Sequence, residues 1–304
     1  MFKLNWKRLG LAAGLSLSLF AAGCGTDEED TTDEGTGDEG TSLVGEGKEI
    51  ELAYVEWDSE VASTHVVGKV LEDLGYDVTL TPLDNTVMWE AVANGEADGM
   101  VAAWLPATHG SQYEEYADQM VELGANLEGA RIGLVVPEYM DVDSIADLTD
   151  QADQTVTGIE PGAGVVAAAE KAVNEDYANL DGWEVQTSSS GAMATELGSA
   201  YEKEEDVIVT GWTPHWKFAK YDLKYLEDPE GSFGDAESIE TMVRKGLEED
   251  LPNAYKVLDQ FNWEAADMES VMLEVSDGTA IEDAAASWVE ENEEKISEWT
   301  EGVE

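Results

Sequence analysis

The sequence predicts an α/β protein with two lobes, because short apolar strands alternate with amphipathic helices and this strand–helix cycle occurs twice. The length supports the same prediction. About 255 residues follow the polar N-terminal part, which is long for one hydrophobic core and comfortable for two. Strands joined by helices form parallel-type sheets flanked by helices. Ligands of such sheets bind beyond the carboxyl ends of the strands, so functional residues are expected there.

The first cycle is expected to contain strands 50–55, 77–81 and 99–104, with helices 59–74 and 86–94 between them. Ser59 or Ser63 is the expected N-cap of the first helix, and Gly75 is expected to end it. An apolar run over 130–137 is expected to cross from one lobe to the other.

The second cycle is expected to contain strands 155–159, 183–187 and 207–212, with helices 165–175 and 191–202. The serines at 188–190 are interpreted as a polar N-cap of the second helix. The rest of the chain is predicted to be helical, over 239–248, 253–261, 264–274 and 281–298.

The N-terminus has the pattern of a secretory signal. Three basic residues precede an apolar run over 9–20 and small residues at 21–23, and Cys24 follows directly. This order is typical of bacterial lipoproteins, which predicts a signal peptide over 1–23 and lipidation of Cys24. Residues 24–47 are predicted to be an acidic flexible tether. The alternative is a soluble exported protein with a free thiol; either way, a lone cysteine excludes an internal disulfide.

The net charge of −53 limits the class of partner, and removal of the three basic residues in the signal lowers it to −56. Nucleic acid and anionic lipid are poor partners for such a surface. Repulsion between the carboxylates fades in molar salt, where the screening length falls to about 3 Å. The composition therefore predicts a host that lives in high salt, with an acidic protein from an ordinary habitat as the alternative.

Three tryptophans occupy similar positions in the pattern. Trp57, Trp104 and Trp212 each follow a short apolar run and stand beside Gly, Pro, Asp or His, where a strand gives way to a loop. Indole faces that converge from several loops form a box whose negative π surfaces attract a cation such as a quaternary ammonium. The alternative is that they fill the core or a domain interface, as most of the 10 tryptophans are expected to do.

A glycine-rich turn over 158–165 lies between a predicted strand and a predicted helix. Backbone N–H groups at a helix start bind anions, and glycines allow close approach. The turn lacks both the Lys-Ser/Thr ending of a nucleotide-binding loop and the G-x-G-x-x-G spacing, so a small carboxylate is the expected anion. A cation box together with a carboxylate site describes a zwitterion such as a betaine.

Catalysis and metal binding have little support. The three histidines are far apart without ligand spacing, so neither a metal nor a cofactor is expected. His65 is interpreted as a surface or packing residue of its helix, and His215 as a support of its loop. An exported hydrolase that uses His109 and an acidic partner remains the enzymatic alternative, although no G-x-S-x-G motif is present.

Four segments resemble the glycine betaine/proline betaine-binding lipoproteins of ABC osmoprotectant importers: 53–60, 103–106 with His109, 211–216 and 223–229. The resemblance runs from about residue 48 to 300. It implies that Trp57, Trp104 and Trp212 surround the trimethylammonium group. It also implies that the backbone amides of Gly164 and Val165, with His109, hold the carboxylate.

The resemblance also implies a periplasmic-binding-protein-like clamshell, anchored by lipid on the outer face of the cell membrane. It would close on its ligand and deliver it to a permease driven by an ATPase, without a reaction of its own. Lobe 1 is expected over 48–136, with 233–304 returning to it, and lobe 2 over 137–232. Some relatives carry the two halves in swapped order, which makes these boundaries harder to transfer.

The ligand alternatives left open are choline or carnitine, and, among betaines, glycine betaine, proline betaine and dimethylsulfonioacetate. Choline carries a hydroxyl where betaine has a carboxylate, so a choline site needs a hydrogen-bond acceptor. The donors expected at Gly164, Val165 and His109 favour a betaine.

Overall fold

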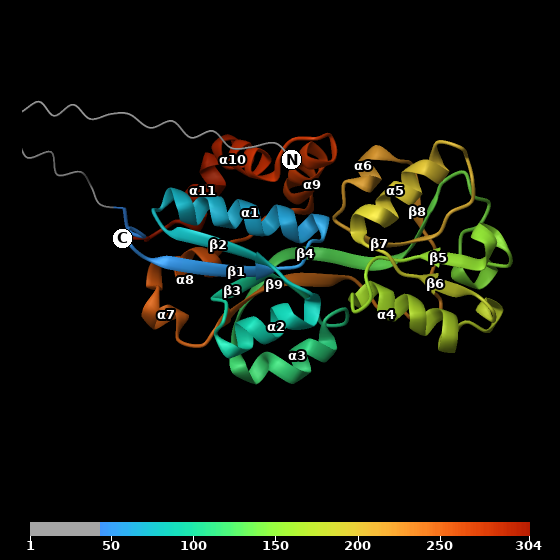
Figure 1. Cartoon of the computed structure of the whole chain (residues 1–304), viewed down its shortest axis with the longest axis horizontal. Coiled ribbons are helices and arrows are strands. Elements are labelled where there is room, and N and C mark those ends of the chain that lie inside the picture. Colours follow the sequence, from blue (N-terminus) through green and yellow to red (C-terminus); the bar gives the residue numbers. More distant parts are fainter. Residues whose placement is uncertain (1–42) are drawn as a thin grey trace, which may run out of the picture. The chain divides into compact units, whose positions relative to one another are not determined.

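The computed structural model describes residues 43–304 (Figure 1). The predicted signal peptide, Cys24 and most of the predicted tether lie outside the described residues. The end of that tether is structured, which corrects its expected boundary at residue 47. Residues 44–47 form a turn, and the Gly45 N–H donates to the carbonyl of Leu74 at 2.9 Å. No helix within 43–304 is both long and apolar enough to span a bilayer.

The described residues form one mixed sheet with the strand order β2-β1-β3-β9-β4-β7-β5-β6, and β8 pairs with β4. The strands are β1 (Glu49–Tyr54), β2 (Asp77–Pro82), β3 (Gly99–Leu105), β4 (Met120–Pro137), β5 (Thr155–Thr157), β6 (Glu184–Gln186), β7 (Val209–Thr213), β8 (Leu223–Tyr225) and β9 (Glu237–Arg244).

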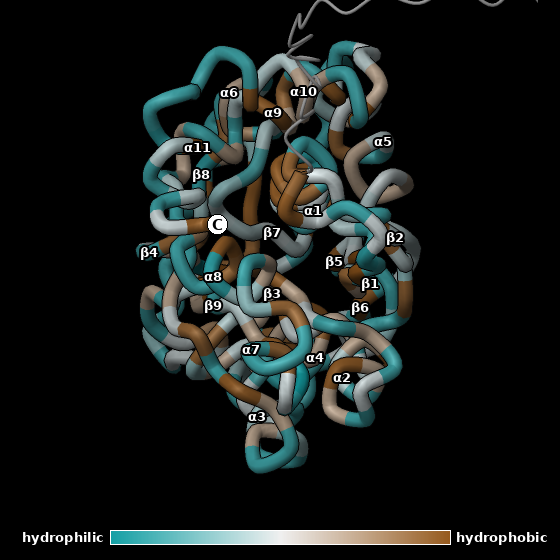
Figure 2. Tube along the Cα trace, turned by 90° about the vertical axis from the view of Figure 1, so that its left-hand side faces the viewer, coloured by the Kyte–Doolittle hydropathy of each residue, from teal (hydrophilic) through white to brown (hydrophobic). Residues whose placement is uncertain are grey.

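Helices cover both faces of this sheet (Figure 1). They are α1 (Asp58–Asp73), α2 (Asn85–Asn94), α3 (Gly110–Tyr116), α4 (Gly164–Lys171), α5 (Ser190–Tyr201), α6 (Lys217–Lys220), α7 (Leu247–Asp250), α8 (Pro252–Gln260), α9 (Ala265–Ser276), α10 (Ile281–Glu291) and α11 (Glu293–Trp299). Figure 2 shows that hydrophobic stretches run along α1 and the strands, whereas hydrophilic residues dominate the outer loops.

The two predicted strand–helix cycles are both present and have the same topology. β1 pairs in parallel with β2 and β3, and β5 pairs in parallel with β6 and β7. The three-stranded units place the carboxyl ends of β1, β3 and β7 near one another. The expectation of parallel-type sheets holds for these units only, because β4 and β9 join them by antiparallel pairing.

β4 connects the two units within a single strand. It pairs with β9 as far as Ala130 and with β7 from Arg131 onward. The apolar run over 130–137 therefore continues a longer strand that begins at Met120.

β9 corrects the prediction of a helix over 239–248. From Glu237 to Thr241 its residues alternate between buried and half-buried positions, and Met242 and Val243 after them are both buried. This is the period of a strand rather than of a helix. Pairing with β3 on one side and β4 on the other places the segment in the middle of the sheet, which outweighs its helix-forming residues.

Smaller corrections concern helix ends. α1 begins one residue before Ser59, its N-cap is Trp57, and Ser59 and Ser63 are buried inside the helix. Gly75 follows the helix with a φ of +95°, as its predicted role requires. The helix predicted over 281–298 is divided at Asn292, whose side chain donates to the carbonyl of Trp288.

An aromatic cluster of Phe261, Trp263, Trp288 and Trp299 lies among the C-terminal helices and in the loop between α8 and α9. Trp288 stacks on Trp299 at 5.6 Å between ring centroids, and Trp263 meets Trp288 edge-on at the same distance. All four are buried. These tryptophans are core residues, as expected for most of the tryptophans in the chain.

Candidate ligand-binding site

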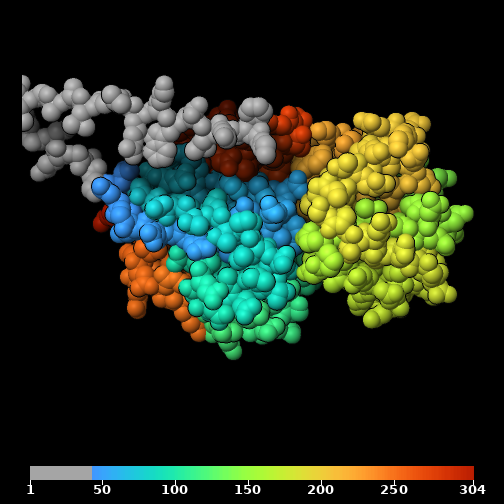
Figure 3. Space-filling view, in the orientation of Figure 1, coloured from blue at the N-terminus to red at the C-terminus, as the bar shows by residue number. Residues whose placement is uncertain are grey.

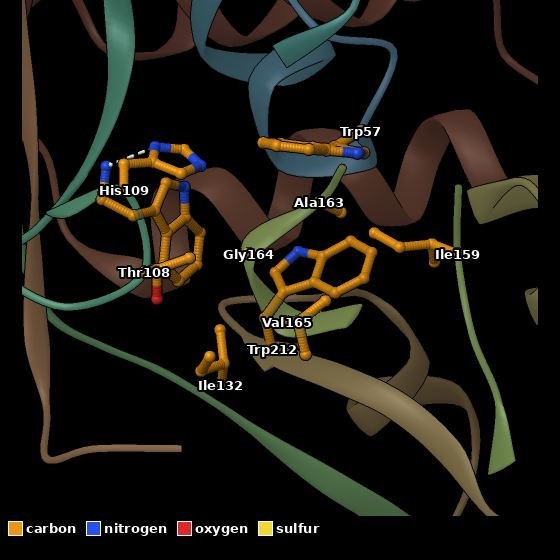
Figure 4. A pocket seen from close by; sticks show the side chains of 10 residues that line it. Trp57, Thr108, His109, Ile132, Ile159, Ala163, Gly164, Val165 and Trp212 are labelled. Atoms are coloured by element: carbon orange, nitrogen blue, oxygen red, sulfur yellow. Dashed lines mark hydrogen bonds between the residues drawn. The ribbon is translucent and has the colours of Figure 1, made fainter. Parts of the chain in front are cut away.

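The candidate site is a pocket at the carboxyl ends of β1, β3 and β7 (Figure 4). Its lining is predominantly apolar and aromatic: Trp57, Trp104, Thr108, His109, Ile132, Ile159, Ala163, Gly164, Val165 and Trp212. Each of the six predicted ligand-binding residues is in this list.

The three predicted tryptophans reach the pocket from different strands. Trp57 stands between β1 and α1, Trp104 in β3 and Trp212 in β7. Figure 4 shows Trp57 above the open space and Trp212 below it, with His109 on one side and Ile159 on the other. Because the indoles face the pocket from different directions, they can surround a compact group.

His109 is fully buried, and its ring is fixed on several sides. Its Nδ1 accepts a hydrogen bond from the backbone N–H of Trp104 at 3.1 Å. The ring stacks on Trp57 at 5.7 Å and meets Trp89 edge-on at 5.9 Å. Burial lowers the pKa of His109 to about 3, so the ring is neutral and its proton lies on Nε2. That nitrogen makes no hydrogen bond of normal geometry within the described residues, although the ring lies near the backbone of Ala102, so Nε2 is a candidate donor to a ligand.

The loop that carries His109 is organised by a residue that the sequence analysis missed. The buried carboxylate of Glu237 accepts hydrogen bonds from the N–H groups of Ala107 at 2.9 Å and Thr108 at 2.8 Å. It also accepts one from the Thr108 hydroxyl. The contact joins residues about 130 positions apart, and no local signal predicts it. Glu237 therefore fixes the loop between Trp104 and His109 from the first residue of β9.

The start of α4 supplies unpaired donors. Its N-cap carbonyl, that of Ala163, accepts from Val166 and Ala167, both at 3.1 Å. The N–H groups of Gly164 and Val165 have no acceptor within the described part of the chain, as expected in a first helical turn. Two adjacent N–H groups at the positive end of a helix form an anion site.

Gly164 also allows a close approach between the two halves of the molecule. A Cβ at this position would lie 2.4 Å from the carbonyl oxygen of Thr108 and 2.5 Å from its Cγ2. The glycine is therefore required by space, because its backbone packs directly on the loop that holds His109.

Further contacts join the segments on the two sides of the pocket. Asn85 of α2 donates to the carbonyl of Gly162 at 3.2 Å, and the indole N–H of Trp57 donates to Glu160. Figure 3 shows the residues of the first strand–helix unit, in blue and teal, directly against the yellow-green second unit. Polar contacts thus join the segments that carry the two sides of the pocket.

Asp58, at the start of α1, is the centre of another such group. Its carboxylate accepts from the Ser190 hydroxyl and the Trp216 indole N–H, both at 2.7 Å. The ring nitrogen Nε2 of His215 lies 3.5 Å away. Burial alone would raise the pKa of Asp58, but these donors hold it well below its usual range. His215 therefore lies at a polar contact between α1 and the second unit, in addition to the loop support that was expected of it.

Two buried ionisable residues lie behind the tryptophans, and neither was predicted. Glu60 accepts from the N–H of Val55 at 3.2 Å, and burial raises its pKa well above the usual value. The ammonium of Lys217 lies 4.3 Å from the ring centroid of Trp212. Burial lowers the pKa of Lys217 to about 7.

Residues 43–304 contain no group of three His, Cys, Asp or Glu that could hold a metal ion. Ser189 caps α5, its hydroxyl accepting from the N–H of Ala192 at 3.3 Å, which agrees with the interpretation of the serine run as a helix cap.

Comparisons with known proteins agree with this geometry. The family model for the substrate-binding domain of ABC-type glycine betaine transport systems matches residues 48–291. The glycine betaine/carnitine transport binding protein GbuC of Listeria monocytogenes is 49% identical over 162 residues, which covers 53% of this chain and 54% of the relative. The match thus spans about half the length of that curated relative.

Solved structures cover more of the chain. Lactococcal OpuAC, in a closed conformation with glycine betaine, is 53% identical with a TM-score of 0.81, covering 84% of this chain and all of that one. A choline-binding protein of an ABC transporter, in complex with choline, is 26% identical with a TM-score of 0.78, covering 84% of this chain and 92% of that one. The predicted two-lobe clamshell fold is confirmed. The chain belongs to the family of substrate-binding domains of ABC-type glycine betaine transport systems.

Proposed function

We propose that this protein is the extracytoplasmic substrate-binding protein of an ABC importer, and that it captures glycine betaine or proline betaine and delivers it to a permease and its ATPase. The observation that carries the proposal is the composition of one pocket. Three indoles, a neutral histidine donor and two unpaired helix N–H groups line the same small space. The indoles match a cationic group and the N–H donors match a carboxylate, so a small molecule that carries both groups fits the pocket.

The cationic end is recognised by the indole faces. A trimethylammonium group cannot donate a conventional hydrogen bond, so it needs an apolar, electron-rich surround, which Trp57, Trp104 and Trp212 supply. A partly desolvated cation–π contact contributes about 1 to 2 kcal/mol, so three contribute roughly 3 to 6 kcal/mol.

The carboxylate end is recognised by donors. The N–H groups of Gly164 and Val165 and the Nε2–H of His109 are available for it. Charge-assisted hydrogen bonds contribute about 1.5 to 3 kcal/mol each. After the free-energy costs of association and lobe closure, a micromolar dissociation constant, about −8 kcal/mol, is attainable.

A choline ligand fits this pocket less well. The choline-binding relative shows that the fold accommodates choline. The hydroxyl of choline needs an acceptor, whereas the polar groups offered here are donors. Carnitine carries both a trimethylammonium and a carboxylate, but a longer chain separates the two groups. A betaine satisfies both ends in the least space.

The proposed lobes comprise residues 48–136 with 233–304, and residues 137–232. β4 serves both lobes, because it changes partner from β9 to β7 at Ala130 and Arg131, and β9 returns the chain to the first lobe. Closure would occur about these two strands. A lipid on Cys24 would anchor the protein to the outer face of the cell membrane, and the bound ligand would leave chemically unchanged.

A fluorescence titration in high salt tests the proposal. Glycine betaine, proline betaine, carnitine, choline and tetramethylammonium are added to the purified protein, and tryptophan emission is recorded. We expect saturable changes with micromolar constants for the two betaines, and weaker binding of choline and tetramethylammonium. Tighter binding of choline than of either betaine would contradict the proposal, and turnover of a bound ligand would revive the hydrolase alternative.

A further inference from the structure

Lys217, the first residue of α6, is fully buried within the protein. Its Nζ lies 4.3 Å from the ring centroid of Trp212 and 5.4 Å from that of Phe218. No acceptor for this ammonium exists within residues 43–304. A buried lysine without an ion pair or hydrogen bond is rare, because transfer of the charge out of water is costly. The contact with Trp212 is therefore its main polar interaction.

Lys217 contacts an indole of the box without reaching the ligand space. Trp212 lines the pocket, whereas Lys217 does not. One face of the indole is already covered by the lysine, so a cation in the pocket must use the remaining surface. A ligand cation and Lys217 would then be separated by little more than the thickness of the ring and two van der Waals contacts.

We propose that Lys217 determines the selectivity of the pocket for zwitterions over ligands with a net positive charge. This inference deepens the proposed function and rests on it. A positive charge behind Trp212 repels any cation in the box. A betaine recovers most of that loss, because its own carboxylate is attracted by the same charge. Choline or tetramethylammonium recovers none of it.

The size of the effect follows from Coulomb's law. Two unit charges about 8.5 Å apart, at an effective dielectric constant of about 20, change an equilibrium constant roughly 30-fold. A ligand carboxylate about 3.5 Å farther from the lysine is attracted by the same charge, and this attraction strengthens binding about 10-fold. The charge on Lys217 should therefore weaken a net cation by roughly 30-fold and a betaine by roughly 3-fold, which is a 10-fold gain in selectivity.

Glu269 of α9 accepts a hydrogen bond from the backbone of His215, and burial raises its pKa, so it is a further group that can titrate near this region. The two groups nearest Lys217 do not change the difference between the two ligands. Asp58 faces it from α1 and is ionised, and the adjacent His215 is neutral because burial lowers its pKa to about 4. Both keep their charge between pH 6 and pH 9. The pKa of Lys217, about 7, lies inside this range, so its charge can be removed by pH as well as by mutation.

Calorimetric titration of glycine betaine and tetramethylammonium at pH 6 and pH 9 tests the proposal, on the wild-type protein and on Lys217→Met. Methionine has a similar length without the charge and packs well against aromatic rings. In the wild type, we expect the ratio of the tetramethylammonium dissociation constant to the betaine dissociation constant to be about 3-fold larger at pH 6 than at pH 9. The full 10-fold difference is not reached at pH 6, because a bound cation lowers the pKa of Lys217 below about 7 and part of the lysine loses its proton. In Lys217→Met, we expect the same ratio at pH 6 and at pH 9. This ratio should equal that of the wild type at pH 9.

Glu60 provides the main competing explanation, because its raised pKa makes it a second candidate for titration near the box. A change with pH that persists in Lys217→Met belongs to another group, Glu60 or Glu269, and overturns the assignment to Lys217. An unchanged ratio in the wild type between pH 6 and pH 9 also overturns it, even if the variant does not fold. Failure of the wild type to bind betaine would instead refute the proposed function, and the tetramethylammonium titration would still report on Lys217.

Discussion

Replacement of Gly164 by alanine tests whether the closed arrangement of the two lobes is the one that binds ligand. Real Cβ atoms essentially never come closer than 3.0 Å to a neighbour, and the new Cβ would lie 2.4 Å from the Thr108 carbonyl oxygen. The new Cβ is attached directly to the backbone and its neighbour is a backbone oxygen, so no side-chain rotation relieves this contact. The start of α4 and the loop before His109 must move apart.

The expected loss follows from the geometry of the pocket. The box and the carboxylate donors are divided between the segments that would separate, so the ligand cannot keep optimal distances to both. Charge-assisted hydrogen bonds contribute about 1.5 to 3 kcal/mol each. Weakening two of them and one cation–π contact should cost about 2 to 4 kcal/mol, or roughly 30- to 800-fold in affinity. Stability without ligand should change little if the two segments separate in the free protein, because the clash with Thr108 is then absent.

Calorimetric titration with glycine betaine and thermal unfolding without ligand are the measurements. Gly191→Ala is the matched control, because Gly191 also lies in the first turn of a helix in the proposed second lobe and a Cβ there meets nothing within 4 Å. We expect the control to bind as the wild type does. Wild-type affinity in Gly164→Ala would show that the close contact with Thr108 is not part of the ligand-bound state.

Three further predictions concern the box, the histidine and the surface charge. Alanine at Trp57, Trp104 or Trp212 should each weaken betaine binding by about 1 to 3 kcal/mol, whereas Trp263→Ala should lower the melting temperature and leave the affinity of the folded protein intact. His109→Ala should weaken betaine by roughly 10- to 150-fold and tetramethylammonium only slightly. The variant also removes the acceptor of the Trp104 N–H, so a parallel loss for both ligands would assign His109 a structural role. With a net charge of −53, the melting temperature should rise between low and molar sodium chloride, and a salt-independent value would refute the role of self-repulsion.

The sequence was sufficient to place the three box tryptophans in one pocket, although they are separated by 47 and by more than 100 positions. Each lies at the end of a strand that a local apolar run predicts. Ligands bind beyond the carboxyl ends of parallel strands, so the three tryptophans are expected to lie close together. The repeated strand–helix cycle was likewise predictable, because its strands and helices have local hydrophobic patterns.

The features that were missed depend on contacts between distant segments. β9 was taken for a helix because its central position in the sheet is set by β3 and β4, which no local pattern reports. Glu237 and Lys217 resemble ordinary charged residues in the sequence, and only the folded chain buries them. Burial of a charged group is decided by what packs around it, so its function could not be inferred from residue type.

The character of the pocket also suits the charge of the protein. In molar salt the screening length is about 3 Å, so the field of a strongly anionic surface cannot guide or hold a ligand over longer distances. Recognition must then act at contact, in a space from which salt ions are excluded. Indole faces and backbone N–H groups meet this requirement, because their partial charges are fixed by covalent structure and attract no counterions of their own. An ion pair on the open surface would weaken as salt rises, whereas the buried pocket formed by Trp57, Trp104 and Trp212 would not.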